Sequence, residues 1–256
     1  MSGAAEMARE LRHALDPALF ARERLGITPD PWQERILKTS AKRVILTCSR
    51  QSGKSTTAAI LAVHQAIYHP GSLILMVSPT QRQSSELFGK ARHFIGLLPA
   101  APKLVSDGAM ACKFATGSRI VALPGDAAGV RGYSAPRLVI ADESAFTPDD
   151  LFVTIQPMLA VSNGALWLMS TPNGRQGFHY NVWTDGGDDW HRESITADQC
   201  PRITPEFLAE EERLNGPHYM RTEYRCEFLE GTHQYFSDEA IRAVLSDAVP
   251  RLDLVF

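Results

Sequence analysis

The chain has 256 residues, of which 44% are hydrophobic and 21% are charged, and its formal net charge is −3. This composition fits an ordinary globular protein of one large or two small domains, and it excludes a wholly disordered chain, a collagen-like rod and a disulfide-dense miniprotein. It also excludes a protein that is basic throughout, so any contact with nucleic acid has to come from a local patch.

The sequence carries no sign of a membrane or secretory segment. No apolar stretch approaches the ~20 residues that a membrane helix needs, and the N-terminus has charges in place of the apolar core of a signal peptide. The four cysteines form no C-x-x-C pair, which is typical of reduced thiols. We therefore expect a cytoplasmic protein that is neither secreted nor in contact with a membrane.

Three regions follow one another along the chain. Residues 1–30 are expected to form an N-terminal helical segment, because Asp16-Pro17 pairs a helix N-cap with a proline at the first helical position. Residues 31–200 alternate short apolar runs with helical patterns and are expected to form the core. Residues 201–256 turn helical again and are expected to form a lid and a linker.

The core region predicts an α/β fold with a mostly parallel central sheet flanked by helices, because buried strands alternate with helices. Ligands of such sheets bind at the carboxyl ends of the strands. The expected buried strands are 44–48, 73–77, 137–141 and 165–169, with a hairpin over 111–123, an edge strand at 191–196, and helices at 58–67, 81–98, 149–160, 207–214 and 219–228.

The first predicted strand leads into the sequence CSRQSGKST at residues 48–56, whose end matches the core of a phosphate-binding loop, the Walker A motif. Gly53 lets backbone N–H groups turn toward a phosphate, Lys54 neutralises phosphate charge, and Ser55 offers a hydroxyl to Mg²⁺. Cys48 stands where the general motif has its first Gly. The tripeptide alone also arises by chance, but its place between a strand and a helix favours the phosphate loop. The expected ATP-binding residues of the loop are Ser49, Arg50, Gln51, Ser52, Gly53, Lys54, Ser55 and Thr56.

The third buried strand ends in Asp142 and Glu143, as a Walker B motif requires. Asp142 is expected to hold Mg²⁺ through its water shell, and Glu143 to orient and deprotonate the attacking water. Two exposed carboxylates at a strand end are common, so the pair gains its meaning from the phosphate loop upstream. Together they predict an enzyme that hydrolyses ATP with Mg²⁺.

The fourth buried strand ends in Ser170 and Thr171. Small hydroxyl side chains at this position can contact both the γ-phosphate site and the next element, so we expect them to couple hydrolysis to movement. The sequence Pro172-Asn173-Gly174 that follows is also an ordinary turn, and by itself the turn interpretation would be preferred.

In this order the motifs resemble those of the N-terminal ATPase domain of the large terminase subunit, the DNA-packaging motor of tailed phages. The resemblance implies a P-loop NTPase of the RecA-like, ASCE type with a small C-terminal helical lid subdomain, and it places Gln33 where such proteins contact adenine. In this family the phosphate loop often lacks its first Gly, as it does at Cys48. The matching segments are 50–55, 130–132, 140–145, 170–174 and 223–228, the last expected to be the helix that closes the domain.

The resemblance also implies partners and an assembly. It implies double-stranded DNA, a portal protein and a small terminase subunit, with a ring of subunits on the portal, a monomer in isolation, and the host cytoplasm as location. Complete terminases carry an RNase H-like nuclease with several metal-binding carboxylates. We expect no nuclease activity in this chain, since only four carboxylates follow residue 230, namely Asp238, Glu239, Asp247 and Asp253.

Arg131 lies in a Gly-containing loop just before the Walker B strand. By resemblance to terminases it is expected to be an arginine finger that reaches the γ-phosphate in a neighbouring subunit. A local ion pair with Asp126 or Asp142 is the alternative. Four other cations are candidate DNA contacts but are more simply interpreted as solvated surface charges, namely Arg82, Lys90, Arg92 and Arg175.

Two other functions compete with a DNA-translocating ATPase. A helicase-like nucleic-acid-dependent ATPase needs a second RecA-like domain, and none fits after residue 200. A nucleotide-dependent assembly switch would bind ATP and a protein partner, and Glu143 argues against such slow switching without excluding it.

Overall fold

The computed structural model of the chain describes residues 3–99 and 101–229. Its centre is one eight-stranded sheet in the order β3-β4-β5-β2-β6-β7-β1-β8. The strands from β5 to β8 in this order are all parallel, and β4 runs antiparallel between β3 and β5. The strands are β1 (Arg43–Cys48), β2 (Leu73–Ser78), β3 (Leu104–Asp107), β4 (Ala111–Phe114), β5 (Arg119–Pro124), β6 (Leu138–Asp142), β7 (Ala165–Ser170) and β8 (Trp190–Ile195).

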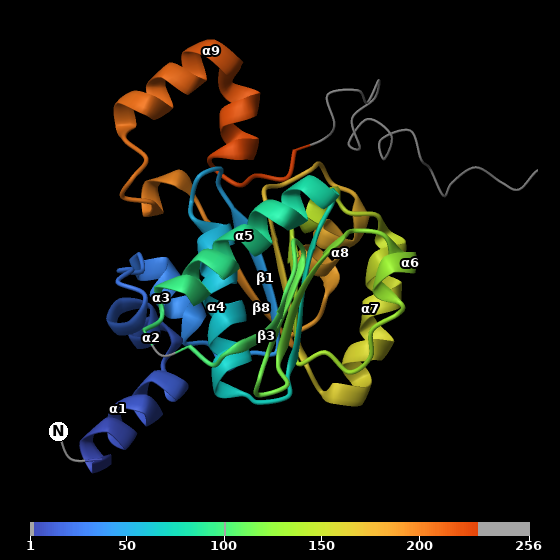
Figure 1. The fold of residues 1–256 in the computed structure, drawn as a ribbon. Helices are drawn as coiled ribbons and strands as arrows, with labels where there is room; N and C mark the ends of the chain where they lie inside the picture. The colour runs from blue at the N-terminus through green and yellow to red at the C-terminus, as the bar shows by residue number, and fades with distance from the viewer. Residues whose placement is uncertain (1–2, 100, 230–256) are drawn as a thin grey trace, which may run out of the picture.

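Helices cover both faces of this sheet (Figure 1). On one face α4 and α5 pack against the sheet together with α2 and α3, and on the other face lie α6, α7 and α8. The helices are α1 (Gly3–Leu15), α2 (Pro17–Arg24), α3 (Pro31–Leu37), α4 (Lys54–Tyr68), α5 (Gln81–Leu97), α6 (Ala127–Val130), α7 (Asp149–Ser162), α8 (Gly177–Asp185) and α9 (Pro205–Glu223), with short 3₁₀ turns η1 (Ser144–Phe146) and η2 (Ala197–Gln199).

The predicted α/β class is confirmed, and the reason lies in the central strands. Every residue of β2 and β6 is buried, so these strands consist of nearly continuous apolar runs with no polar face. Alternate residues of one strand feed two separate cores: Ile74 and Met76 pack with α4 and α5, whereas Leu75 and Val77 pack with α7.

The two edges of the sheet differ. The expected hairpin forms as β4 and β5, which pair antiparallel across a turn at Gly117, where φ is +87°. The expected edge strand near residue 191 is β8, which pairs parallel with β1. The sequence patterns did not predict β3, whose residues are mostly exposed and therefore show no apolar pattern.

The C-terminal helical region projects beyond the carboxyl ends of the strands (Figure 1). α9 breaks at Gly216, where φ is +81°, and packs through Met220 and Tyr224 against the residues after β8. The expected helix over 219–228 is wrong in its second half. The helix ends at Glu223, and Cys226 takes a φ of +61°, so segment 224–228 closes the domain as an irregular arm. The linker expected after residue 229 lies outside the described residues.

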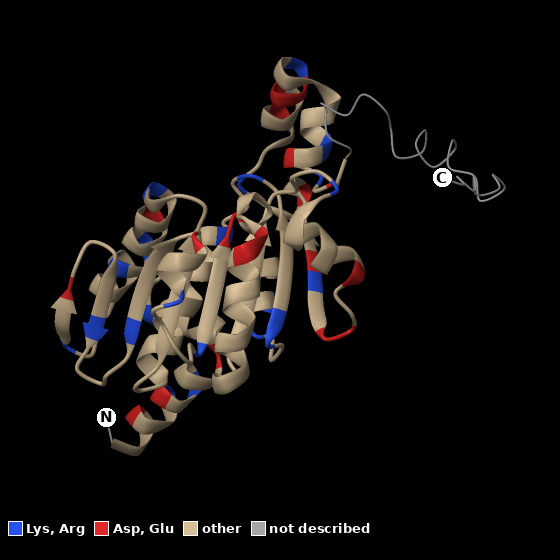
Figure 2. Cartoon of the chain, turned by 90° about the vertical axis from the view of Figure 1, so that its right-hand side faces the viewer, with Lys and Arg blue, Asp and Glu red and all other residues tan. Residues whose placement is uncertain are grey.

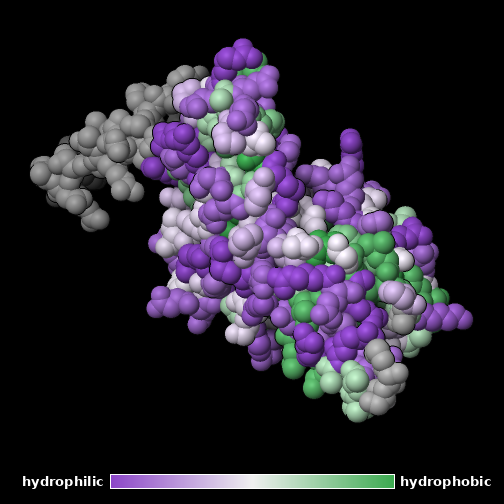
Figure 3. Space-filling model, turned by 90° about the vertical axis from the view of Figure 1, so that its left-hand side faces the viewer, coloured by the Kyte–Doolittle hydropathy of each residue, from purple (hydrophilic) through white to green (hydrophobic). Residues whose placement is uncertain are grey.

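The N-terminal helix α1 is amphipathic and stands at the opposite end of the molecule. Met7, Leu11 and Leu15 are exposed along one side of it. The surface on this side of the molecule is mostly hydrophilic, with apolar patches on the lower body (Figure 3). Among the described residues, no helix is both long enough and apolar enough to cross a bilayer.

Candidate active site

The predicted site residues meet at the carboxyl edge of the sheet because three strands that are distant in sequence are adjacent in space. β6, β7 and β1 are neighbours, so their C-terminal ends bring Asp142, Ser170 and the loop after Cys48 to one place. Charged residues lie mainly at the ends of the strands and in the surrounding helices and loops (Figure 2).

The loop between β1 and α4 has the conformation of a phosphate-binding loop. Gln51 and Gly53 take positive φ values of +56° and +97°. A Cβ on Gly53 would lie 2.8 Å from Gln33 Nε2 and 3.0 Å from Arg202 Nη2, so only glycine fits in both conformation and space.

Several backbone N–H groups of this loop are available to an anion. Ser49 N donates to Ile195 O at 2.8 Å and Arg50 N to Glu223 O at 2.9 Å, which anchors the loop to its neighbours. Within the described part of the chain, four further amides have no acceptor, and they surround the first turn of α4, where helix N–H groups favour phosphate. These amides belong to Gln51, Gly53, Lys54 and Ser55.

Lys54 and Glu143 form the central ion pair of the site, with Nζ and Oε1 2.8 Å apart. Burial by itself lowers the pKa of Lys54, but the carboxylates of Glu143 and Asp142 outweigh it and raise this pKa above its ordinary value. Lys54 is therefore a buried ammonium that stays charged because two carboxylates face it.

Asp142 is the second buried carboxylate. Burial raises its pKa, and Glu143 adds to this, while Lys54 and the hydrogen bond from Ser55 act in the opposite direction. Ser55 Oγ donates to Asp142 Oδ2 at 3.0 Å. Adjacent oxygen ligands of an octahedral Mg²⁺ lie about 2.9 Å apart, so this pair of oxygens fits the ion in both type and spacing.

Glu143 is held in an unusual backbone conformation. Its φ of +52° and ψ of +43° are left-handed, which is uncommon for a residue with a side chain and marks a strained turn. Ser170 Oγ donates to Glu143 Oε2 at 3.2 Å, so the end of β7 contacts the carboxylate directly. Thr171 is buried beside it but makes no side-chain hydrogen bond within the described residues.

Gln33 reaches the phosphate loop from α3. Its Oε1 accepts from Asp30 N at 2.8 Å, and its Nε2 donates to Thr57 Oγ1 at 3.0 Å and to Gly53 O at 3.3 Å. The side chain therefore fixes the loop to α3. It retains one unused lone pair on Oε1 for a ligand.

Three residues that sequence reasoning missed complete the wall of the loop. Arg202 forms a two-pronged ion pair with Asp30 and also donates to Ser52 O at 3.0 Å. Glu223, at the end of α9, pairs with Arg50 at 2.7 Å. No local sequence signal identifies these three residues. Arg202 and Glu223 contact the loop from more than 100 residues away in the sequence, and Asp30 has the pattern of an ordinary helix N-cap.

Two predicted residues lie apart from the central cluster. Arg131 is the C-cap of α6, on the opposite side of the sheet from α4, and is exposed (Figure 1). Within the described chain it forms no ion pair; Asp126 instead caps the amide of Gly129, and Asp142 accepts from Ser55.

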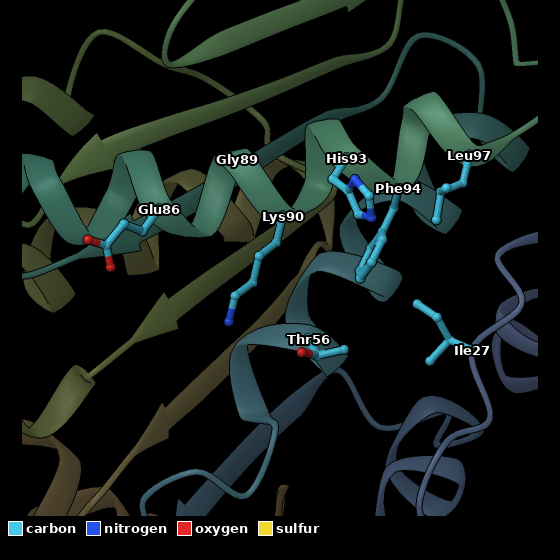
Figure 4. A pocket seen from close by; sticks show the side chains of 8 residues that line it. All are labelled: Ile27, Thr56, Glu86, Gly89, Lys90, His93, Phe94 and Leu97. Carbon is cyan, nitrogen blue, oxygen red and sulfur yellow. The ribbon is translucent and has the colours of Figure 1, made fainter.

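Thr56 lies outside the central cluster. Its side chain lines a separate groove of about 730 Å³ between α4, α5 and the loop at Ile27 (Figure 4). This groove contains neither Lys54 nor the Walker B carboxylates, so it is distinct from the candidate active site.

Residues 45–243 match the family described as terminase large subunit, T4likevirus-type, N-terminal. The chain is 28% identical over 251 residues to the large terminase subunit of Thermus virus P23-45, and the match covers 84% of this chain and 52% of that protein. The chain thus spans about half the length of the curated relatives it matches.

Solved structures agree on the fold. An arginine-to-alanine variant of the large terminase ATPase domain of Thermus phage P74-26 superposes with a TM-score of 0.75 at 24% identity, covering 84% of this chain and 100% of that one. The large terminase of bacteriophage D6E in complex with ADP gives a TM-score of 0.61 at 12% identity, covering 85% of this chain and 53% of that one. The fold is therefore that of terminase ATPase domains, and the chain belongs to the family of N-terminal domains of the terminase large subunit.

Proposed function

We propose that this chain is the ATPase domain of a viral DNA-packaging motor, which hydrolyses ATP to drive double-stranded DNA into a procapsid. The observation that carries the proposal is the cluster of Lys54, Glu143, Asp142 and Ser55 at the ends of β1 and β6, in which Lys54 and Asp142 are buried and the other two are half-buried. It combines a phosphate-binding cation, a pair of Mg²⁺ ligands and a general base within one hydrogen-bonded set.

The phosphate loop binds the β- and γ-phosphates through its available amides and Lys54. Because Lys54 pairs with Glu143, phosphate oxygens compete with that carboxylate for the ammonium. Binding of ATP thus frees Glu143 Oε1 for the attacking water, while Ser170 continues to hold Oε2. The unused lone pair of Gln33 suits the amino group of adenine.

Ser55 and Asp142 would hold Mg²⁺. Bound there, the ion supplies positive charge that offsets the charge on the β- and γ-phosphates. Glu143 accepts a proton from the water that attacks the γ-phosphorus, and the bond to the β-phosphate oxygen breaks, giving ADP and phosphate. Ser170 and Thr171 connect this event to β7 and the turn that follows it.

The stimulating arginine comes from a neighbouring subunit in a ring on the portal. Arg131 is exposed and lacks a local partner in the described chain, so it is available to a γ-phosphate outside its own subunit. DNA, the portal and a small terminase subunit are the partners of this assembly.

The test is ATP hydrolysis by the purified chain, alone and with double-stranded DNA and a portal. A packaging motor hydrolyses ATP slowly alone and is stimulated only when DNA and portal are both present. Tight ATP binding with no stimulation by DNA would instead identify a nucleotide-dependent assembly switch. Failure to bind ATP at all would overturn the site itself.

A further inference from the structure

Behind Glu143 lies a buried pair of polar side chains that the proposed reaction does not use. Ser144 Oγ and His179 Nδ1 are 2.7 Å apart, and Ser144 Oγ also lies 3.4 Å from Met169 O. Both residues are almost completely buried, Ser144 at 1% exposure and His179 at 0%. Ser144 is the residue directly after Glu143 and begins the 3₁₀ turn η1.

One arrangement of the protons gives every donor of this pair an acceptor. Burial lowers the pKa of His179 to about 3, so its ring is neutral at physiological pH. If Nδ1 carries the proton, it donates to Ser144 Oγ, and the Ser144 hydroxyl donates to Met169 O, which gives both donors an acceptor. His179 Nε2 has no partner in the described structure and is then only an unused acceptor.

These hydrogen bonds hold both the carboxylate of Glu143 and the backbone turn that carries it. Met169 is followed by Ser170, which binds the Glu143 carboxylate, so β7 supports the side chain through Ser170 and the backbone turn through Ser144. The left-handed conformation of Glu143 is strained for a residue with a side chain and persists only where its surroundings fix it. His179 supplies one of those constraints from α8.

The arm that follows α9 packs beside the His179 ring. The ring of Phe228 lies 6.1 Å from that of His179 and 5.2 Å from that of Tyr180, centroid to centroid. Arg175 Nε donates to Phe228 O at 3.2 Å, which holds the arm on the segment just before α8. In this packing the ring nitrogen that faces Ser144 is Nδ1.

We propose that His179 is a positioning residue for hydrolysis, whose Nδ1–H holds Ser144 and thereby the turn that aims Glu143 at the attacking water. The inference rests on the proposed role of Glu143 as general base. His179 touches neither nucleotide nor water in this role, and it acts only through Ser144.

Two isosteric variants separate this role from simple core packing. In His179→Asn the amide nitrogen replaces Nδ1, whereas in His179→Gln it reaches toward the position of Nε2, which has no partner. We expect His179→Asn to keep the rate of hydrolysis within about threefold of wild type. His179→Gln should lower this rate about tenfold or more, because the hydrogen bond that positions Ser144 is lost. ATP affinity should stay the same in both.

The measurement is single-turnover hydrolysis of labelled ATP by the full chain, beside equilibrium binding of a fluorescent ATP analogue. Ser144→Ala removes the same link from the other side, so it should match His179→Gln, and the double variant should be no slower than either. Ser144→Ala also serves as the test if His179→Gln does not fold.

The outcomes distinguish this inference from the proposed function. If His179→Asn and His179→Gln hydrolyse ATP equally well while Glu143→Gln is inactive, the positioning role of His179 is wrong and the general base stands. If Glu143→Gln hydrolyses ATP like wild type, the proposed function of the site is wrong. A loss that appears only in ATP affinity, or equally in both isosteres, assigns His179 to packing alone and overturns the inference.

Discussion

The two ends of the sheet carry charge in different ways. At the carboxyl edge Lys54, Asp142 and Glu143 are drawn from segments far apart in sequence, and each charged group lies against an opposite charge or a hydroxyl donor. Their pKa values follow from burial and from one another, so a change in one group is felt by the others.

At the amino edge a groove of about 810 Å³ is lined by Lys42, Arg119 and Arg137, with no acidic residue among its lining in the described chain. Figure 2 shows Lys and Arg, in blue, at the lower ends of several strands. The three cations are exposed, and within the described residues Arg137 bonds only to neutral partners, Gln65 Oε1 at 2.7 Å and His69 Nε2 at 3.0 Å. Opposite charges held together by tertiary contacts, more than the number of cations, therefore distinguish the carboxyl edge.

The largest expected effect on ATP hydrolysis is that of replacing Arg131, which lies neither among the charged residues of the carboxyl edge nor in the amino-edge groove of its own subunit. In assembled rings Arg131→Ala should lower the hydrolysis rate by ~10³–10⁵, the usual contribution of an arginine finger, while ATP affinity of the monomer stays unchanged. Arg137→Ala, at the other end of the same connection, is the matched control and should hydrolyse like wild type.

Mixed rings test whether Arg131 acts on a neighbouring subunit. Arg131→Ala keeps an intact pocket and Glu143→Gln keeps an intact arginine, so a ring of both should recover activity that neither shows alone. If mixed rings form and remain inactive, Arg131 acts within its own subunit or only in structure.

The next effect is expected at Glu143. Glu143→Gln should reduce hydrolysis by ~10²–10⁴, because an amide cannot take the proton of water. ATP binding should be equal or tighter, since Lys54 loses its competing carboxylate. Steady-state hydrolysis and nucleotide binding measure the two parts, with Glu86→Gln on the exposed surface of α5 as control. Weaker ATP binding in Glu143→Gln would contradict the competition for Lys54.

Lys54→Ala should weaken ATP binding by at least about 100-fold, because removing one member of a buried ion pair leaves carboxylates facing the phosphates unopposed. Lys54→Arg should also bind poorly, since a planar guanidinium does not replace a compact ammonium in a closed pocket. Isothermal titration with ATP measures both variants. Wild-type affinity in Lys54→Ala would mean that phosphates bind elsewhere.

The contrast between the two edges extends along α4 itself. Lys54 at its start stays charged, whereas burial lowers the pKa of His64, further along the same helix, to about 4. Between this value and the ordinary 6.5 the unfolded chain binds a proton that the folded chain does not. The free energy of unfolding therefore falls as pH drops through this window, by about 2 kcal/mol between pH 7 and pH 5.

His64→Gln removes this titration while keeping a donor near His13 O, the partner of His64 Nε2 at 2.9 Å. Urea unfolding at pH 7 and pH 5 should show a smaller difference in the variant than in wild type. An unchanged difference would assign the acid sensitivity to other groups, His179 first among them, since its pKa is lowered in the same direction.

The smallest effect is expected at the amino edge. Burial, with Arg137 beside it, lowers the pKa of His69, so Arg137→Ala should raise that pKa toward its ordinary value. ATP affinity should change by less than about twofold, as for most surface substitutions. An NMR titration of the histidine ring and a binding measurement record both. A large loss of ATP affinity in Arg137→Ala would mean that the amino edge of the sheet contributes to nucleotide binding.

Strong local patterns were enough to predict several elements from the amino-acid sequence. Apolar runs such as Leu73–Ser78 predicted buried parallel strands, and Lys54, Asp142 and Ser170, at or shortly after the ends of such runs, predicted the content of the site, because parallel strands bring their carboxyl ends to one edge. Local rules sufficed wherever a few consecutive residues set both the backbone and the chemistry.

How these residues meet depends on contacts between segments that are distant in the sequence. The contacts of Arg202 with Asp30, of Glu223 with Arg50 and of His179 with Ser144 join segments that no periodicity relates. The end of the last helix was misjudged for the same reason, since Cys226 leaves the helix to donate to Ile195 O rather than to follow its local pattern. Hydrogen bonds and ion pairs between distant segments depend on burial and direction, and these exist only once the sheet has formed.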